Sequence, residues 1–117
     1  MPLIVTPGQL QQRAELYHQL GTLIAAGIGL PQALETIERK PPARSFSAPL
    51  AQLRSYLSQG ETFIGAVSKL GTWVPSFDAA LLEAGERSGR LDACFKLLAV
   101  YYEDRSKMVR GVISDLM

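Results

Sequence analysis

Apolar residues recur along most of this chain at the three- and four-residue spacing that marks one face of a helix. The first such stretch follows Thr6-Pro7-Gly8, where a hydroxyl can cap free backbone N–H groups and a proline fits the first helical turn. Its apolar stripe consists of Leu10, Ala14, Tyr17, Gly21 and Ile24, widened by Leu16, Leu20 and Leu23. The pattern predicts an amphipathic helix that faces the core and ends at 26–29.

Three shorter helices are predicted in the middle of the chain. The first runs from Pro31 to Ile37, and the prolines within 40–45 then exclude a helix and indicate a linker. The next spans 47–59, and the third begins after a Thr62 cap and ends at Gly71. Their apolar stripes are Ala33 and Leu34 with Ile37; Leu50, Leu53 and Leu57; and Phe63, Ala66, Val67 and Leu70.

Two further helices are predicted after Pro75, joined by a glycine-containing corner at 85–91. The fifth helix has the stripe Phe77, Ala80, Leu81 and Ala84, and the sixth has Leu91, Phe95, Leu98, Tyr102, Val109, Val112 and Leu116. No stop signal precedes Met117, so the sixth helix is about 40 Å long and its far end should project from the bundle.

No segment alternates β-branched and polar residues, so the predicted fold is all-α: a six-helix antiparallel bundle with short loops and a long C-terminal helix. The 117 residues fit one domain, 1–117, in which 1–8 form an N-terminal extension. A chain of this length buries about two-thirds of its unfolded surface, enough for a core without disulfides.

Composition excludes several classes of function. The formal charge of +1 provides no basic field, so nucleic acid is not an expected partner. Cys94 is the only cysteine, which excludes an internal disulfide and a cysteine-rich zinc site. The N-terminus lacks the features of a secretory signal, and no apolar run reaches the about 18 residues of a membrane span. We therefore expect the chain as given to be soluble.

Candidate catalytic groups are scarce, so we expect neither an enzyme nor a cofactor. His18 is the only histidine, and it is interpreted as a hydrogen-bonded structural residue beside the first stripe. The segment 85–89 superficially resembles a nucleophile elbow, but its serine is one place late and no strand precedes it. Cys94 is interpreted as a small buried apolar residue. No glycine loop of the phosphate-binding kind occurs.

The corner between the fifth and sixth helices carries the most distinctive residues: Gly85, Glu86, Arg87, Ser88, Gly89, Arg90 and Leu91. Its glycines permit a positive φ or a close helix approach. Glu83 and Glu86 with Asp92 could hold a cation, but neutralisation by Arg87 or Arg90 is the favoured reading. We expect Glu86 and Ser88 to tie the fifth helix to the sixth, while contact with a partner at this corner stays open.

Four motifs together resemble the cytoplasmic domain of the type II secretion system F family, from about Leu16 to Glu103. They are QLxxLxxAGxxLxxAL, matched by Gln19-Leu20, Leu23, Ala26-Gly27, Leu30 and Ala33-Leu34; Gly60-Glu61-Thr62-Phe63 with Ala66; Pro75; and GExSGxL, matched by Gly85, Glu86, Ser88, Gly89 and Leu91. Two positions depart from the family pattern, because Leu16 replaces its usual phenylalanine and Gly29 its usual proline.

This resemblance implies a scaffold without enzymatic activity or cofactor at the cytoplasmic face of the bacterial inner membrane. Such platform proteins serve type II secretion and type IV pilus machines, and usually have two such domains and about three membrane spans. The implied partners are the assembly ATPase and other inner-membrane machine proteins, and a homodimer is also considered. The structural motif residues, which are also candidates for partner contact, are Gly85, Glu86, Ser88, Gly89, Leu91, Gln19 and Gly27; the expected interface residues are Glu83, Arg87, Arg90 and Tyr102.

The resemblance also implies that 105–117 lead toward a membrane span outside this chain, with Arg105, Lys107 and Arg110 as its positive flank. The alternative reading is a free-standing helical adaptor that binds a partner peptide or helix in a groove between its helices. A continuation past Met117 into about 20 apolar residues would favour the platform reading, and a natural end there would favour the adaptor.

Overall fold

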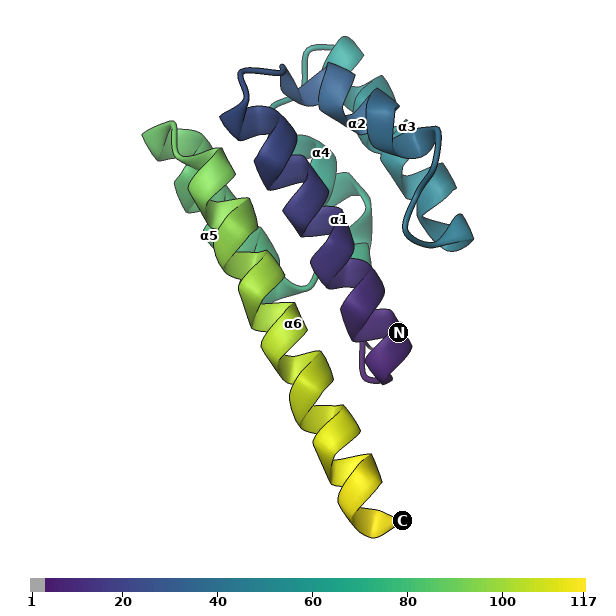
Figure 1. Cartoon of the computed structure of the whole chain (residues 1–117). Coiled ribbons are helices and arrows are strands. Elements are labelled where there is room, and N and C mark those ends of the chain that lie inside the picture. The colour runs from purple at the N-terminus through teal and green to yellow at the C-terminus, as the bar shows by residue number, and fades with distance from the viewer. Residues whose placement is uncertain (1–3) are drawn as a thin grey trace.

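The computed structural model describes residues 4–117, in which six α-helices and two short 3-10 turns occur and no strand does (Figure 1). The helices are α1 (Pro7–Ala25), α2 (Leu30–Glu38), α3 (Ser47–Ser58), α4 (Phe63–Lys69), α5 (Ser76–Ser88) and α6 (Leu91–Leu116); the turns are η1 (Arg44–Phe46) and η2 (Gly71–Trp73). The predicted all-α, six-helix fold is therefore confirmed, with every helix close to its expected place.

The start of α1 follows from its capping residues. The side chain of Thr6 accepts a hydrogen bond from the backbone N–H of Gln9, whose own side chain accepts one from the backbone N–H of Thr6. Pro7 is therefore already helical, inside the segment 1–8 that the sequence suggested as an extension. Residues 1–3 of that segment lie outside the described part of the chain.

The antiparallel pair of α1 and α6 forms the centre of the fold (Figure 1). At one end, the hydroxyl of buried Ser106 donates a hydrogen bond to the carbonyl oxygen of Pro7 at 3.2 Å. Toward the other end, Gly21 lies against Phe95, where an added Cβ would come within 3.3 Å of the Phe95 Cβ. In Figure 1, α2 and α3 lie on the far side of α1 from α6, whereas α5 lies beside α6.

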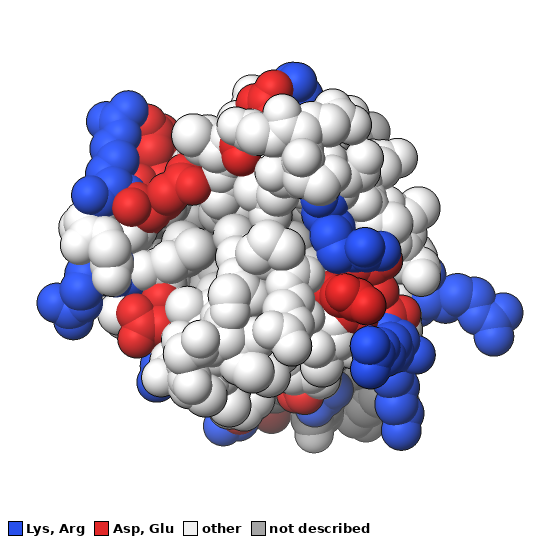
Figure 2. Space-filling view, turned by 90° about the horizontal axis from the view of Figure 1, so that it is seen from above, with Lys and Arg blue, Asp and Glu red and all other residues white. Residues whose placement is uncertain are grey.

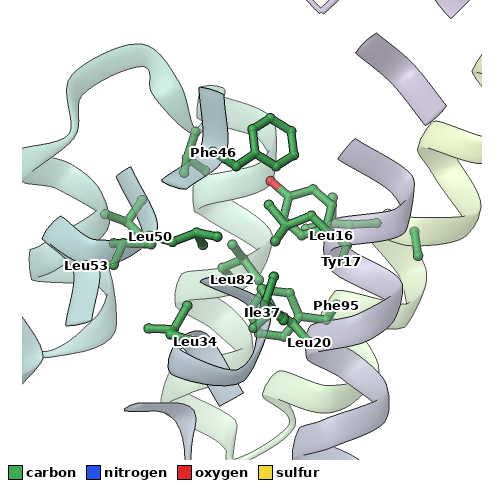
Figure 3. Packing of buried hydrophobic residues seen from close by; sticks show 14 of the residues in the cluster. Leu16, Tyr17, Leu20, Leu34, Ile37, Phe46, Leu50, Leu53, Leu82 and Phe95 are labelled. Carbon is green, nitrogen blue, oxygen red and sulfur yellow. The ribbon is translucent and has the colours of Figure 1, made fainter. Parts of the chain in front are cut away.

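The core consists of apolar side chains from all six helices (Figure 3). The predicted stripe of α1 is buried at Leu10, Ala14, Tyr17 and Gly21 and also at Leu16 and Leu20. Figure 3 shows side chains of α1, α2 and α3 pointing toward one another, with Leu82 among them. Each large apolar side chain buried in this way contributes about 1.5–3 kcal/mol relative to exposure.

Of the four residues predicted for the inner face of α5, only Leu81 packs against the core, where it is partly buried. Phe77, Ala80 and Ala84 are exposed, and the buried residues of α5 are Asp78, Leu82 and Gly85. The helix is thus rotated by about one residue, or 100°, from the expected orientation. The reason is that α5 places a carboxylate and a glycine, two types that an apolar pattern does not count, against its neighbours.

The far end of α6 projects from the bundle, as the sequence predicted (Figure 1). The described residues extend over 50 × 26 × 25 Å, and 110–117 are exposed throughout. Within residues 4–117, no helix combines the length and the apolar character that crossing a bilayer requires.

His18 of α1 was expected to be a hydrogen-bonded structural residue, but its side chain is exposed to solvent.

Candidate functional site

The corner between α5 and α6 depends on the conformation of Gly89. This residue ends α5 with φ of 72° and ψ of 21°, the left-handed conformation in which a side chain would be strained. The backbone N–H groups of Gly89 and Arg90 both donate to the carbonyl oxygen of Gly85, the latter at 2.8 Å. The corner therefore satisfies carbonyl groups at the end of α5, as in a glycine-capped helix terminus.

Gly85 has a different purpose, since it lets α6 approach α5 closely. A Cβ at this position would lie 2.7 Å from the Cys94 Sγ, 3.1 Å from the Cys94 Cβ and 3.2 Å from the Leu91 Cα. Cys94 is buried in this contact, which confirms its interpretation as a small packing residue. The two glycines of the corner are thus both structural, for two separate reasons.

Glu86 ties α5 to α4 rather than to α6. Its carboxylate accepts hydrogen bonds from the backbone N–H groups of Phe63 at 2.7 Å and Ile64 at 3.1 Å. These two groups begin α4 and have no partner within the helix, so a carboxylate is well suited to them. Ser88 does not reach α6 either, because its hydroxyl donates to the carbonyl oxygen of Ala84 in its own helix at 2.8 Å.

The charged residues of the corner lie apart from one another. Glu83 pairs with Arg87 at 2.7 Å across one turn of α5, as the favoured reading expected, and Arg90 is exposed. Nowhere in residues 4–117 do three histidine, cysteine, aspartate or glutamate side chains gather as metal ligands would, so the structure does not bring Glu83, Glu86 and Asp92 together.

The two remaining motif residues, Gln19 and Gly27, lie at a distance from the corner in the sequence and serve α1. The side-chain amide of Gln19 donates to the carboxylate of Glu15 at 2.8 Å, one turn earlier on the same helix. Gly27 has φ of 90° in the turn after α1, where its backbone N–H donates to the carbonyl oxygen of Ile24 at 3.0 Å. Gly27 thus has a conformational reason for being glycine.

Tyr102 is almost completely buried. Its side chain is 5% exposed, and its hydroxyl donates to the carboxylate of Asp78, with distances of 2.9 and 2.8 Å to the two oxygens. The hydroxyl of Tyr17 donates to the same carboxylate at 2.7 Å. Because its hydroxyl is held between α1 and α5, Tyr102 exposes little surface, and its place at an interface stays a prediction.

Asp78 is the polar residue that the sequence analysis missed. Burial raises the pKa of its carboxyl group, while the hydrogen bonds from Tyr17 and Tyr102 act in the opposite direction. Burial also raises the pKa of Tyr102, and the neighbouring Asp78 raises it further, so the phenol keeps its proton and donates. A signal was present: two tyrosines lie on predicted inner stripes, and a buried phenol needs a hydrogen-bond partner.

Arg13 forms a second buried polar feature. Its guanidinium carbon lies 4.3 Å from the ring centroid of Trp73 and 5.2 Å from that of Phe46. Its Nε and Nη1 atoms are buried and have no hydrogen-bond partner within residues 4–117. Aromatic faces therefore stabilise this cation, and they join α1 to the two 3-10 turns.

A groove of about 750 Å³ runs beside these buried residues. Apolar side chains of α4 and α5 line it together with the hydroxyl groups of Ser68, Thr72 and Ser76, and Tyr101, Tyr102 and Arg105 of α6 lie along one side. Such a lining suits a segment of another molecule that carries both apolar and polar side chains.

The surface around the corner carries charges of both signs. Figure 2 looks onto the end of the bundle opposite the tip of α6, and it shows acidic and basic side chains around an uncharged centre. Lys and Arg are interspersed with Asp and Glu on this face, so no continuous basic area forms here. This face therefore lacks the basic area that nucleic-acid binding requires.

Comparisons with known proteins agree with this architecture. The family model described as Type II secretion system (T2SS), protein F, matches residues 16–117. The chain is 36% identical over 111 residues to the Type IV pilus assembly protein PilC of Thermus thermophilus, covering 95% of this chain and 27% of that protein. It is 35% identical over 103 residues to the Protein transport protein HofC homolog of Escherichia coli, covering 88% and 26%.

A third relative carries the name of the secretion machine. The Type II secretion system protein F of Vibrio cholerae is 31% identical over 98 residues, covering 81% of this chain and 23% of that protein. The chain thus spans about a quarter of the length of these relatives. Since the match extends from Leu16 in α1 to the end of the chain, this chain belongs to the type II secretion system protein F family.

Proposed function

We propose that this chain is a non-enzymatic scaffold domain of an inner-membrane platform protein for type II secretion or type IV pilus assembly. The observation that carries the proposal is the family match over residues 16–117, together with relatives named for both machines. The geometry supports it, because the buried ionisable side chains Arg13 and Asp78 are held by aromatic rings and phenols of the fold. Such groups stabilise a bundle rather than perform chemistry.

The partners proposed are the assembly ATPase and other inner-membrane proteins of the same machine, met at the cytoplasmic face. The exposed charges beside the corner, Arg87 and Arg90 with half-exposed Glu83, are suited to rim contacts that steer a protein partner. A homodimer is a further proposed contact, and nucleic acid is not a proposed partner. Attachment to the membrane is proposed to lie in other segments of the platform protein, with Arg105, Lys107 and Arg110 of α6 as a positively charged flank.

The test is binding of this chain to the assembly ATPase encoded in the same genome, measured by isothermal titration calorimetry. Reversal of both corner charges in Arg87→Glu/Arg90→Glu should weaken binding by about tenfold, which corresponds to about 1.4 kcal/mol. Arg39→Glu is the matched control, because Arg39 also pairs with a glutamate one turn away, Glu35 on α2.

Two outcomes would contradict parts of this proposal. If the wild-type chain fails to bind the ATPase, docking of that partner is wrong. If the corner variant and the Arg39→Glu control bind equally well, the contact lies elsewhere on the domain. Circular dichroism should show both variants folded, with melting temperatures within about 6 °C of the wild type, since exposed ion pairs contribute at most about 1 kcal/mol.

A second candidate function is a helical adaptor for a partner peptide or helix, favoured by the groove along α4, α5 and α6. Deletion of the gene in its native bacterium separates the two. Loss of secretion or of pili supports the platform proposal, whereas a strain that retains both processes supports the adaptor.

A further inference from the structure

Several large apolar side chains are exposed along the outer side of α6. Leu97 and Met108 are 61% and 67% exposed, Val100 is 57% exposed, and Tyr101 lies between them. Phe77 of α5 extends the patch, since it is 57% exposed and its ring centroid lies 5.2 Å from that of Tyr101. Single exposed apolar residues are ordinary, but a contiguous patch of large ones marks a contact surface.

The shape of this patch fits one helix. Residues 97, 100, 101, 104 and 108 follow the i, i+3, i+4, i+7, i+11 spacing of a single face, opposite the buried face of α6 that carries Phe95, Leu98 and Tyr102. From 97 to 108 the face rises about 16 Å, or three turns. A long, narrow apolar seam of this kind accommodates the apolar stripe of another helix.

Asp104 gives the seam a charge requirement. It lies on the same face between Tyr101 and Met108, is exposed, and forms no ion pair within residues 4–117. Neither of the cations nearest in sequence pairs with Asp104: Lys107 pairs with Glu103 at 3.5 Å, and the guanidinium of Arg105 lies 5.5 Å from the ring centroid of Tyr101 within the seam. A partner that covers the seam must therefore neutralise Asp104 or leave a carboxylate without a counter-charge.

We infer that the outer face of α6, formed by Leu97, Val100, Tyr101, Asp104 and Met108 with Phe77, docks an amphipathic helix of another protein whose apolar stripe carries one basic residue opposite Asp104. This inference rests on the proposed scaffold role and deepens it by giving the chemistry of one partner. The apolar side chains of the seam supply the affinity. Asp104 sets the register of the partner helix along α6 and selects against partner helices with an acidic residue on their apolar stripe.

The test uses two synthetic amphipathic peptides of about 18 residues, or five turns, with leucine and alanine on the apolar stripe. They differ only at the centre of the stripe, which is lysine in one and glutamate in the other. Fluorescence anisotropy with the wild-type chain should show the lysine peptide binding about tenfold more tightly. Asp104→Lys should reverse that preference, and Leu97→Gln should weaken both peptides.

Glu15→Lys is the charge control, because Glu15 is an exposed acid on α1, outside the seam; the preference for lysine should survive it. Absence of binding by both peptides, or a preference that Asp104→Lys leaves unchanged, overturns the inference. Sedimentation that shows a dimer of the wild-type chain, dissociated by Leu97→Gln, assigns the face to a second copy instead and equally overturns it.

These results are separable from the scaffold proposal. If the peptides fail while the corner variant still loses the ATPase, only the seam is wrong. If the peptides bind as expected while the ATPase does not bind, the inference about the seam is supported and the proposed ATPase contact is wrong.

Discussion

Asp78 joins three helices through one carboxylate. Asp78 belongs to α5, and its carboxylate accepts hydrogen bonds from the hydroxyl of Tyr17 on α1 and from the hydroxyl of Tyr102 on α6. Burial favours the protonated acid, the two hydrogen bonds and the charge of Arg13 favour the ionised form, and the balance leaves the pKa of Asp78 raised. A buried carboxylate held in this way specifies one orientation of α5, but its ionisation costs free energy of folding.

The sign of the pH dependence follows from that raised pKa. Because the folded state holds the proton more tightly than the unfolded state, the contribution of Asp78 to stability is full below its unfolded pKa and is lost as the pH rises through its folded pKa. Asp78→Asn removes this titration and keeps an oxygen that can accept the phenol protons. The free energy of unfolding of the wild type minus that of Asp78→Asn should therefore fall as the pH rises above the ordinary pKa of an aspartate, about 3.9.

Urea unfolding followed by circular dichroism at several pH values measures this difference. Asp115→Asn is the control for the substitution itself, because Asp115 is an exposed acid near the end of α6. A difference that is level or rises with pH for Asp78→Asn would show that hydrogen bonding outweighs burial at this site.

At the scale of elements, the contact of α5 with α6 depends on the missing side chain of Gly85. Close approach here brings the backbone of Leu91 within 3.2 Å of an added Cβ, and Cys94 within 2.7 Å. Backbone and a buried side chain cannot move aside as a surface side chain can. The helix pair therefore has to separate if Gly85 gains a methyl group.

Gly85→Ala should destabilise the domain by about 1–3 kcal/mol, the usual cost of overpacking, despite the better helix propensity of alanine. Gly111→Ala is the matched control on α6, since a Cβ there meets nothing within 4 Å, and it should be neutral or stabilising by up to about 1 kcal/mol. Urea midpoints give both values. Equal effects of the two substitutions would show that α5 and α6 are not closely packed at Gly85.

The elements could be predicted from the sequence wherever apolar residues alone face the core. The stripe of α1 and that of α6 as far as Tyr102 were right because leucine and aromatic residues mark those faces. The stripe of α5 was wrong because its inner face carries Asp78 and Gly85, while Phe77 and alanines on its outer face imitate a core stripe. Periodicity records which residues are apolar, not which polar ones are satisfied inside.

Part of the candidate site could likewise be predicted from the sequence, and part could not. The glycines of the corner were assigned correctly, because their conformational requirement is local. The partners of Glu86 and Asp78 were missed, because they lie 22 and 23 residues away for Glu86 and 24 and 61 for Asp78. Pairings at that distance depend on how the helices pack, which a single sequence read by pattern does not specify.

At the scale of the whole molecule, α6 consists of two parts with different surroundings. Its first half packs against α1 at Gly21 and against α5 at Gly85. Its packing extends as far as Ser106, which is hydrogen-bonded to Pro7, and half-buried Val109. Residues 110–117 are exposed on every side.

Removal of 110–117 should therefore change the free energy of unfolding by no more than about 0.5 kcal/mol, as for surface substitutions. Removal of 102–117 should cost at least about 3 kcal/mol, because it deletes buried Tyr102 and leaves Asp78 with one hydrogen bond fewer. Urea unfolding of both truncated chains measures the difference. A large loss from the shorter deletion would show that the tip of α6 folds back onto the bundle.

The first half of α6 is held by close contacts at Gly21 of α1 and Gly85 of α5, and this has a mechanical consequence. A rod held near one end and free at the other behaves as a cantilever, so a sideways load on the tip becomes a bending moment at the point of support. For α6 that point lies near the hydrogen bond from Ser106 to Pro7, where the first turn of α1 meets it. Displacement of the tip would thus place the largest load on the start of α1 and the smallest on α2 and α3, which lie on the far side of α1 (Figure 1).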